Sequence, residues 1–160
     1  MLGIEEVLDY CTDFINTIDD FEDVGIHTDF ECYPTSNEVF IALVVSSKSV
    51  NDFMNNIYNK TKVRDISEFS WSILHEVGHC ETWHKMNKRT INKCRHIKRK
   101  ISRRSIDKRI YYNLTDERIA TEWAIDYIEK NHDLVKKFDD EVLKLIKDFY
   151  LKNGLNADAR

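Results

Sequence analysis

The sequence predicts an α+β domain in which helices dominate and a small β-sheet near the N terminus packs on a central helix. Apolar residues alternate as in strands only between residues 26 and 45, and they recur at helical spacing along most of the remaining chain. The 160 residues are 42% apolar, which is enough for one hydrophobic core. Because the chain has one proline and no Gly/Ser-rich linker, we expect a single domain over 1–160, with a loose tail over 151–160.

The N-terminal part is expected to form a helix, two strands and a second helix. Apolar residues at helical spacing predict the first helix over 4–18. Alternation predicts a strand over 26–32, and the turn-forming run Pro34-Thr35-Ser36-Asn37 leads into a buried strand over Val39–Val45. A short helix over 50–57 should follow.

The C-terminal part is expected to be helical throughout. A long helix should begin at Asp65-Ile66-Ser67-Glu68, which has the form of a capping box, and no proline interrupts it. Residues 85–109 are expected to be a basic helical insertion. A helix with one small-residue face is predicted over 116–128, and a strongly amphipathic closing helix over 134–149.

The long helix carries the sequence His75-Glu76-Val77-Gly78-His79, which has the HExxH spacing of a catalytic zinc site. Residues four apart share a helix face, so His75 and His79 can direct a ring nitrogen at one ion. Glu76 is rotated by about 100° and is placed to act on water rather than on the metal. Gly78 is a poor helix former, which favours a close approach by another backbone at this turn.

A hydrolytic zinc site needs a third protein ligand from outside this motif. A metzincin arrangement is excluded because Thr82 and Lys85 occupy the positions that require glycine and histidine. The favoured ligand is Glu117, which shares a helix stripe with small residues that can pack against the HExxH helix. Glu122 is the second choice, although its own stripe is acidic, and His96 requires the chain to fold back.

Together, HEVGH and the later run ERIATEWA over 117–124 resemble the ImmA/IrrE family of gluzincin zinc peptidases, with tryptophan in place of a phenylalanine. The resemblance implies a minimal zincin fold and one Zn²⁺ per chain held by His75, His79 and Glu117. Related gluzincins often place Asp or Asn at position 121 to orient a ligand histidine, and Thr121 is expected to do so here. The implied substrate is a protein, commonly a DNA-binding helix-turn-helix repressor encoded nearby in phages and other mobile elements.

The same resemblance implies peptide hydrolysis, with Glu76 as the general base that later passes its proton to the departing amine. An edge strand of such enzymes pairs with extended substrate, so Val39–Val45 or its neighbour is expected to hold a peptide. A second group must stabilise the oxyanion of the transition state. Spacing leaves four candidates for that role, which are Tyr111, Tyr112, His84 and His96.

The segment 85–109 has a net charge of about +11. Because the whole chain has a net charge of −4, the net charge of the remainder must be near −15. One interpretation is that the segment docks nucleic acid or an acidic partner. The other, which we favour, is a solvated helix whose charge is neutralised by the acidic body. Ile91, Cys94, Ile97 and Ile101, with Ile106 as a further candidate, form a narrow apolar stripe typical of a surface helix.

Two other functions compete with the peptidase interpretation. The first is a SprT-like protease that acts on DNA-bound proteins and uses His96 as its third ligand. It is disfavoured because SprT-like chains place a His-Gly pair after the HExxH helix, whereas Ile97 follows His96. The second is a zinc-containing binding module without turnover, and Glu76 argues against it because a structural site usually closes its fourth position with Cys or His.

The longest apolar run is too short to cross a membrane, and the acidic N terminus is unlike a signal peptide. We therefore expect a cytoplasmic protein, and the spacing gives no information on its oligomeric state. The four cysteines lack the close-paired spacing of a metal or redox motif and are expected to be reduced thiols, partly buried. They are Cys11, Cys32, Cys80 and Cys94.

Overall fold

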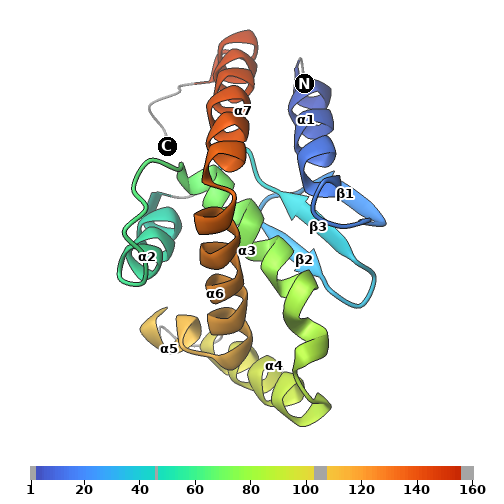
Figure 1. Cartoon of the computed structure of the whole chain (residues 1–160), viewed down its shortest axis with the longest axis vertical. Coiled ribbons are helices and arrows are strands. Elements are labelled where there is room, and N and C mark those ends of the chain that lie inside the picture. The colour runs from blue at the N-terminus through green and yellow to red at the C-terminus, as the bar shows by residue number, and fades with distance from the viewer. Residues whose placement is uncertain (1–2, 46, 103–107, 156–160) are drawn as a thin grey trace.

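The computed structural model describes residues 3–45, 47–102 and 108–155 and has the predicted α+β architecture (Figure 1). Its elements are α1 (Ile4–Asn16), β1 (Asp23–Ile26), β2 (Glu31–Tyr33), β3 (Glu38–Ile41), α2 (Ser47–Tyr58), α3 (Glu68–Thr82), the 3-10 turn η1 (Trp83–Lys85), α4 (Lys88–Ser102), α5 (Lys108–Tyr112), α6 (Thr115–Lys130) and α7 (His132–Lys152). Helices account for most of the described residues, which confirms the predicted fold class.

The sheet has three strands in the order β1-β3-β2, with β1 parallel and β2 antiparallel to β3. The prediction of one strand over 26–32 was wrong, because β1 ends at Ile26 and β2 begins at Glu31. Ile26 pairs with Ile41, whereas Glu31 pairs with the adjacent Phe40 on the other side of β3. The chain must therefore reverse between the two strands to reach the opposite edge of β3.

The predicted buried strand over Val39–Val45 is the central strand of the sheet, but it is shorter, since β3 ends at Ile41. The predicted turn at 34–37 is present, with the Ser36 amide donating to the Tyr33 carbonyl at 3.1 Å. β2 is an outer strand of this sheet and contacts α3, so one edge of the sheet lies next to that helix.

The helix α3 runs through the middle of the fold, between the sheet and the pair α6 and α7 (Figure 1). Its buried side chains include Phe69, Trp71 and Leu74, each with no exposed area. Because α3 is covered on both sides, the HExxH motif is supported by a packed interior rather than by a loop.

The start of α3 differs from the capping box that the sequence predicts at Asp65. Ser67 is the N-cap, and its hydroxyl accepts a hydrogen bond from the Ser70 amide at 3.4 Å. The buried carboxylate of Asp139 accepts from the Ser67 amide and, at 2.6 Å, from the Ser70 hydroxyl. Asp65 pairs instead with His132 at 3.0 Å. Sequence spacing could not reveal a cap that is completed by a helix 72 residues later.

Most of the described part of the basic segment 85–109 is helical, as the end of η1, α4 and the start of α5, whereas Met86 and Asn87 are not helical. Arg103, Arg104 and Asp107, which the charge count includes, lie outside the described residues, as does Ile106. At the C terminus α7 continues to Lys152, so the predicted loose tail is helical at its start, and residues 156–160 are outside the described part. None of the helices within the described ranges is long and apolar enough to cross a membrane.

Candidate metal centre

The centre lies where α3 and α6 pack side by side, and Gly78 permits their close approach. An added Cβ at Gly78 would lie 2.6 Å from the Ala120 carbonyl oxygen and 3.2 Å from the Trp123 ring. Ala120 and Ala124, the small residues predicted to face α3, are fully buried. The expectation that another backbone passes close to this turn is therefore confirmed.

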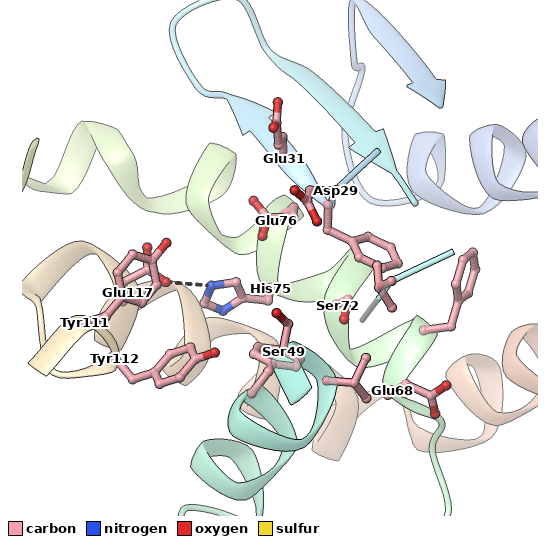
Figure 2. A pocket seen from close by; sticks show the side chains of 15 residues that line it. Asp29, Glu31, Ser49, Glu68, Ser72, His75, Glu76, Tyr111, Tyr112 and Glu117 are labelled. Carbon is pink, nitrogen blue, oxygen red and sulfur yellow. Dashed lines mark hydrogen bonds and ion pairs between the residues drawn. The ribbon is translucent and has the colours of Figure 1, made fainter. Parts of the chain in front are cut away.

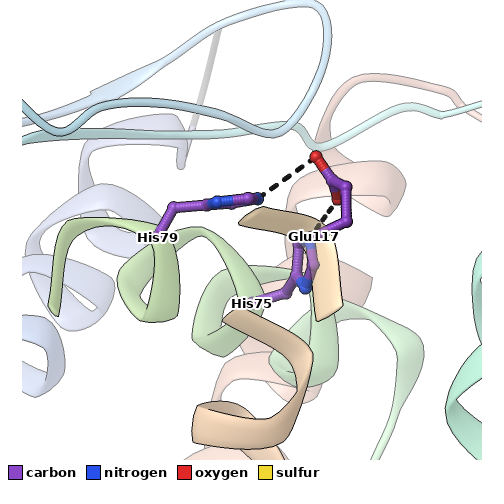
Figure 3. Close-up of side chains that lie close together, drawn as sticks. All are labelled: His75, His79 and Glu117. Atoms are coloured by element: carbon purple, nitrogen blue, oxygen red, sulfur yellow. Dashed lines mark hydrogen bonds and ion pairs between the residues drawn. The ribbon is translucent and has the colours of Figure 1, made fainter. Parts of the chain in front are cut away.

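This packing brings the three predicted ligands together, as Figure 3 shows. Nε2 of His75 is 3.0 Å from Oε2 of Glu117, and Nε2 of His79 is 3.4 Å from Oε1 of the same carboxylate. One ligand atom from each residue lies within 4.8 Å of the others. Since metal-bound N and O atoms lie about 2 Å from zinc, such a cluster needs only small side-chain shifts to enclose an ion.

The ring of His75 is held on both sides. Its Nδ1 lies 3.2 Å from the Thr121 hydroxyl, and both residues are buried. The Phe53 ring contacts the imidazole edge-on, with centroids 5.3 Å apart. Thr121 thus occupies the position expected of an orienting residue, and it leaves Nε2 directed at Glu117.

Glu117 is almost completely buried, with 1% of its surface exposed. Burial alone would raise the pKa of its carboxyl group, but the hydrogen bonds and charges of His75 and His79 outweigh burial and hold the pKa well below its usual range. The residue is therefore an anion beside two imidazoles. Two nitrogens and one carboxylate are the donor set that catalytic zinc sites use, so the residues present fit a divalent cation of this kind.

Glu76 follows His75 in the sequence and faces a cleft beside the three residues (Figure 2). This is the placement predicted for a group that acts on water. It is half-buried and lines two adjoining cavities of about 410 and 430 Å³. Burial raises the pKa of Glu76 to about 7. A carboxyl group with that pKa can both accept and release a proton near neutrality.

The other candidate residues separate into two groups. Tyr111 lines both cavities, and Tyr112 lines the cavity of about 410 Å³ with His75 and Glu117. His84 and His96 are exposed and line neither of these two cavities. Burial raises the pKa of Tyr111, and it raises that of Tyr112 to about 12, so both hydroxyls stay protonated.

Glu122, the second choice for the third ligand, lies on the outer face of α6. Its side chain is 56% exposed and pairs with Arg118 at 2.8 Å. The acidic stripe on which it lies is therefore a solvated face, as the sequence indicated. Among the described residues, the group that could hold a metal is His75, His79 and Glu117.

Sequence reasoning missed Lys98, which reaches the centre from α4. Its ammonium group lies 2.5 Å from Asp116 and also contacts Oε1 of Glu117. Burial alone would lower the pKa of Lys98, but these two carboxylates outweigh it and raise the pKa. A signal was present, because position 98 continues the spacing of Ile91 and Cys94, so this cation lies on the inward stripe of its helix.

Comparisons with protein-family models, curated proteins and solved structures gave no match. Function must therefore be inferred from the side chains of the site.

Proposed function

We propose that this protein is a zinc-dependent endopeptidase of the HExxH type. The observation that supports the proposal most strongly is the meeting of His75, His79 and Glu117 at the α3–α6 contact, with Glu76 facing a cleft beside them. Three protein ligands and an accessible carboxylate are what a hydrolytic site requires, whereas a structural site usually closes the fourth position.

The proposed zinc ion would be held by His75, His79 and Glu117, and the chemistry that it supplies is the acidification of water and the polarisation of a carbonyl group. Glu76 accepts a proton from the attacking water and passes it to the departing amine. Thr121 keeps the His75 ring oriented. Tyr111, which lines both cavities and whose hydroxyl stays protonated, is the best-placed of the four candidates to donate a hydrogen bond to the developing oxyanion.

The substrate peptide would lie along β2. Glu31 and the preceding Phe30 line both cavities, so this outer strand borders the cleft that contains Glu76. An extended peptide can add to such an edge through backbone hydrogen bonds. The proposed peptide-binding edge is therefore β2 rather than the Val39–Val45 strand that the sequence first indicated, because that strand, β3, is paired on both sides.

A helix-turn-helix repressor remains the proposed protein substrate, on the strength of the resemblance to the ImmA/IrrE family. A SprT-like mechanism would require His96 as third ligand, and this residue is exposed on α4. The adjacent gene would supply the first repressor to test.

Glu76→Gln tests the proposal because it removes the base and leaves the three ligands in place. We expect the purified variant to retain one zinc ion per chain by metal analysis and to lose cleavage of an unfolded protein such as casein by about 10²- to 10⁴-fold. Glu122→Gln, on the solvated face, is the matched control and should retain full activity. Zinc bound by a wild-type protein that cleaves neither casein nor the repressor would instead indicate a binding module.

A further inference from the structure

The helix α4 carries seven lysine and arginine residues over Lys88–Ser102 and no acidic residue. Lys98 is neutralised by Asp116 and Glu117. Five others are exposed and form no ion pair with any described residue. They are Lys88, Arg89, Lys93, Arg95 and Lys100.

These cations divide into two faces of α4. At 100° per residue, Lys88 and Arg95 lie within about 90° of Lys98 and share the side of the apolar Ile91. Arg89, Lys93 and Lys100 lie on the opposite side. The first face therefore borders the metal centre, and the second points away from it.

The bordering face forms one wall of the cavity of about 430 Å³ that contains Glu76, His79 and Glu117. Arg95 supplies exposed positive charge on this wall, whereas the charge of Lys98 is matched by Asp116 and Glu117 in the same cavity. Apolar side chains lie beside these two cations. The apolar members are Trp83, Met86 and Ile91. A ligand on this wall is thus in reach of the residues proposed to perform hydrolysis.

The opposite end of the cleft differs in charge. Asp29 and Glu68 line only the cavity of about 410 Å³ (Figure 2), whereas Glu31 lines both cavities. A peptide that crosses the centre from one cavity to the other would meet Asp29 and Glu68 at one end and Arg95 at the other. The charges of the cleft therefore favour one orientation of a peptide with unequal ends.

We propose that the face of α4 formed by Lys88, Ile91, Arg95 and Lys98 docks an acidic, partly apolar segment of the protein substrate next to the scissile bond. The inference rests on the proposed peptidase function and specifies its substrate class. The helix is roughly 22 Å long, which an extended segment of about seven residues would span.

An acidic peptide fits this surface better than nucleic acid does. Outside 85–109 the chain has a net charge near −15, so a long polyanion would be repelled wherever it extends beyond α4. A short peptide contacts α4 alone, and its apolar side chains can cover Trp83 and Met86 in the cavity.

Binding of two fluorescent peptides to the full-length, zinc-supplemented Glu76→Gln variant tests the inference without turnover. One peptide alternates Glu and Leu over eight residues, and the other has Gln in place of Glu. We expect the acidic peptide to bind at least tenfold more tightly by fluorescence anisotropy, with the difference shrinking as salt rises. Equal affinities for the two peptides would overturn the inference.

Arg95→Glu and Lys93→Glu form a matched pair, because both reverse one exposed charge on α4 but on opposite faces. We expect Arg95→Glu to weaken binding of the acidic peptide about tenfold and Lys93→Glu to weaken it less than twofold. Circular dichroism should confirm that both variants are folded. Equal losses, or tighter binding of a 20-base-pair duplex than of the peptide, would refute the docking face.

These outcomes are independent of catalysis. If the acidic peptide binds through Arg95 but the wild-type protein cleaves nothing, the peptidase proposal fails and the docking face stands. If casein is cleaved while the acidic peptide is not bound, the docking face fails and the peptidase proposal stands.

Discussion

The α3–α6 pair and the helix α4 both reach the candidate metal centre, but they do so in opposite ways. The pair contributes the three proposed ligands, held by backbone contact at Gly78, whereas α4 contributes one half-buried lysine and otherwise presents cations to solvent. Packing of the first kind fixes distances to within fractions of an ångström. The exposed charges of α4 attract a binding partner over several ångströms, and this attraction persists when side chains move. We therefore expect substitutions in the pair to alter metal binding and stability, and substitutions in α4 to alter mainly what the protein binds.

The largest effect within the pair is expected from Glu117→Gln. The change removes the negative charge that lies 3.0 Å from His75 and 3.4 Å from His79. We expect zinc affinity, measured by competition with a chromophoric chelator, to fall by more than about 100-fold, since loss of an outer partner alone costs 10- to 100-fold. His96→Ala on α4 should leave the affinity unchanged, and a comparable loss there would remove the contrast between the two regions.

Gly78→Ala tests whether the close contact itself supports the pair. A methyl group would lie 2.6 Å from the Ala120 carbonyl oxygen, which is backbone and cannot rotate away. We expect the free energy of unfolding in urea to fall by about 2 to 3 kcal/mol, although alanine favours an isolated helix by up to about 1 kcal/mol. Glu122→Ala on the outer face of α6 should change it by no more than about 0.5 kcal/mol. A more stable Gly78→Ala protein would show that α3 and α6 are not in contact at this turn.

The two regions also differ in how far the sequence predicts them. Helical spacing and the HExxH motif were sufficient to predict the positions of His75, Glu76 and His79, and the small residues beside Glu117 selected it over Glu122. These inferences depend on local periodicity, which a helix preserves. Asp139 completing the cap at Ser67, and Lys98 reaching Glu117, depend on where distant helices dock, so spacing alone could not predict them.

The sheet shows the same limit. Alternation marked the correct region of the chain, but the reversal between Ile26 and Glu31 depends on both strands pairing with β3. A continuous alternating pattern looks the same whether the chain runs on or turns back.

Thr121→Val should have a smaller effect than loss of a ligand, because it removes only the hydroxyl 3.2 Å from Nδ1 of His75. The side chain keeps its shape, so the helix contact remains. We expect zinc affinity to fall about tenfold by chelator competition. Thr121→Ser, which keeps the hydroxyl, should restore most of the affinity, and if serine were no better than valine the orienting role would be excluded.

The smallest effect is expected from Lys98→Met, which removes the ion-pair contacts of α4 with Asp116 and Glu117. Because the lysine side chain is 26% exposed, solvent screens these pairs, and its aliphatic part can be replaced by methionine. We expect the free energy of unfolding to fall by about 1 kcal/mol in urea. Lys93→Met, on the far face of the same helix, should cause no measurable change. If Lys98→Met instead destabilised the protein as much as Gly78→Ala, α4 would belong to the packed framework of the centre, and the distinction between a fixed pair and a peripheral charged helix would fail.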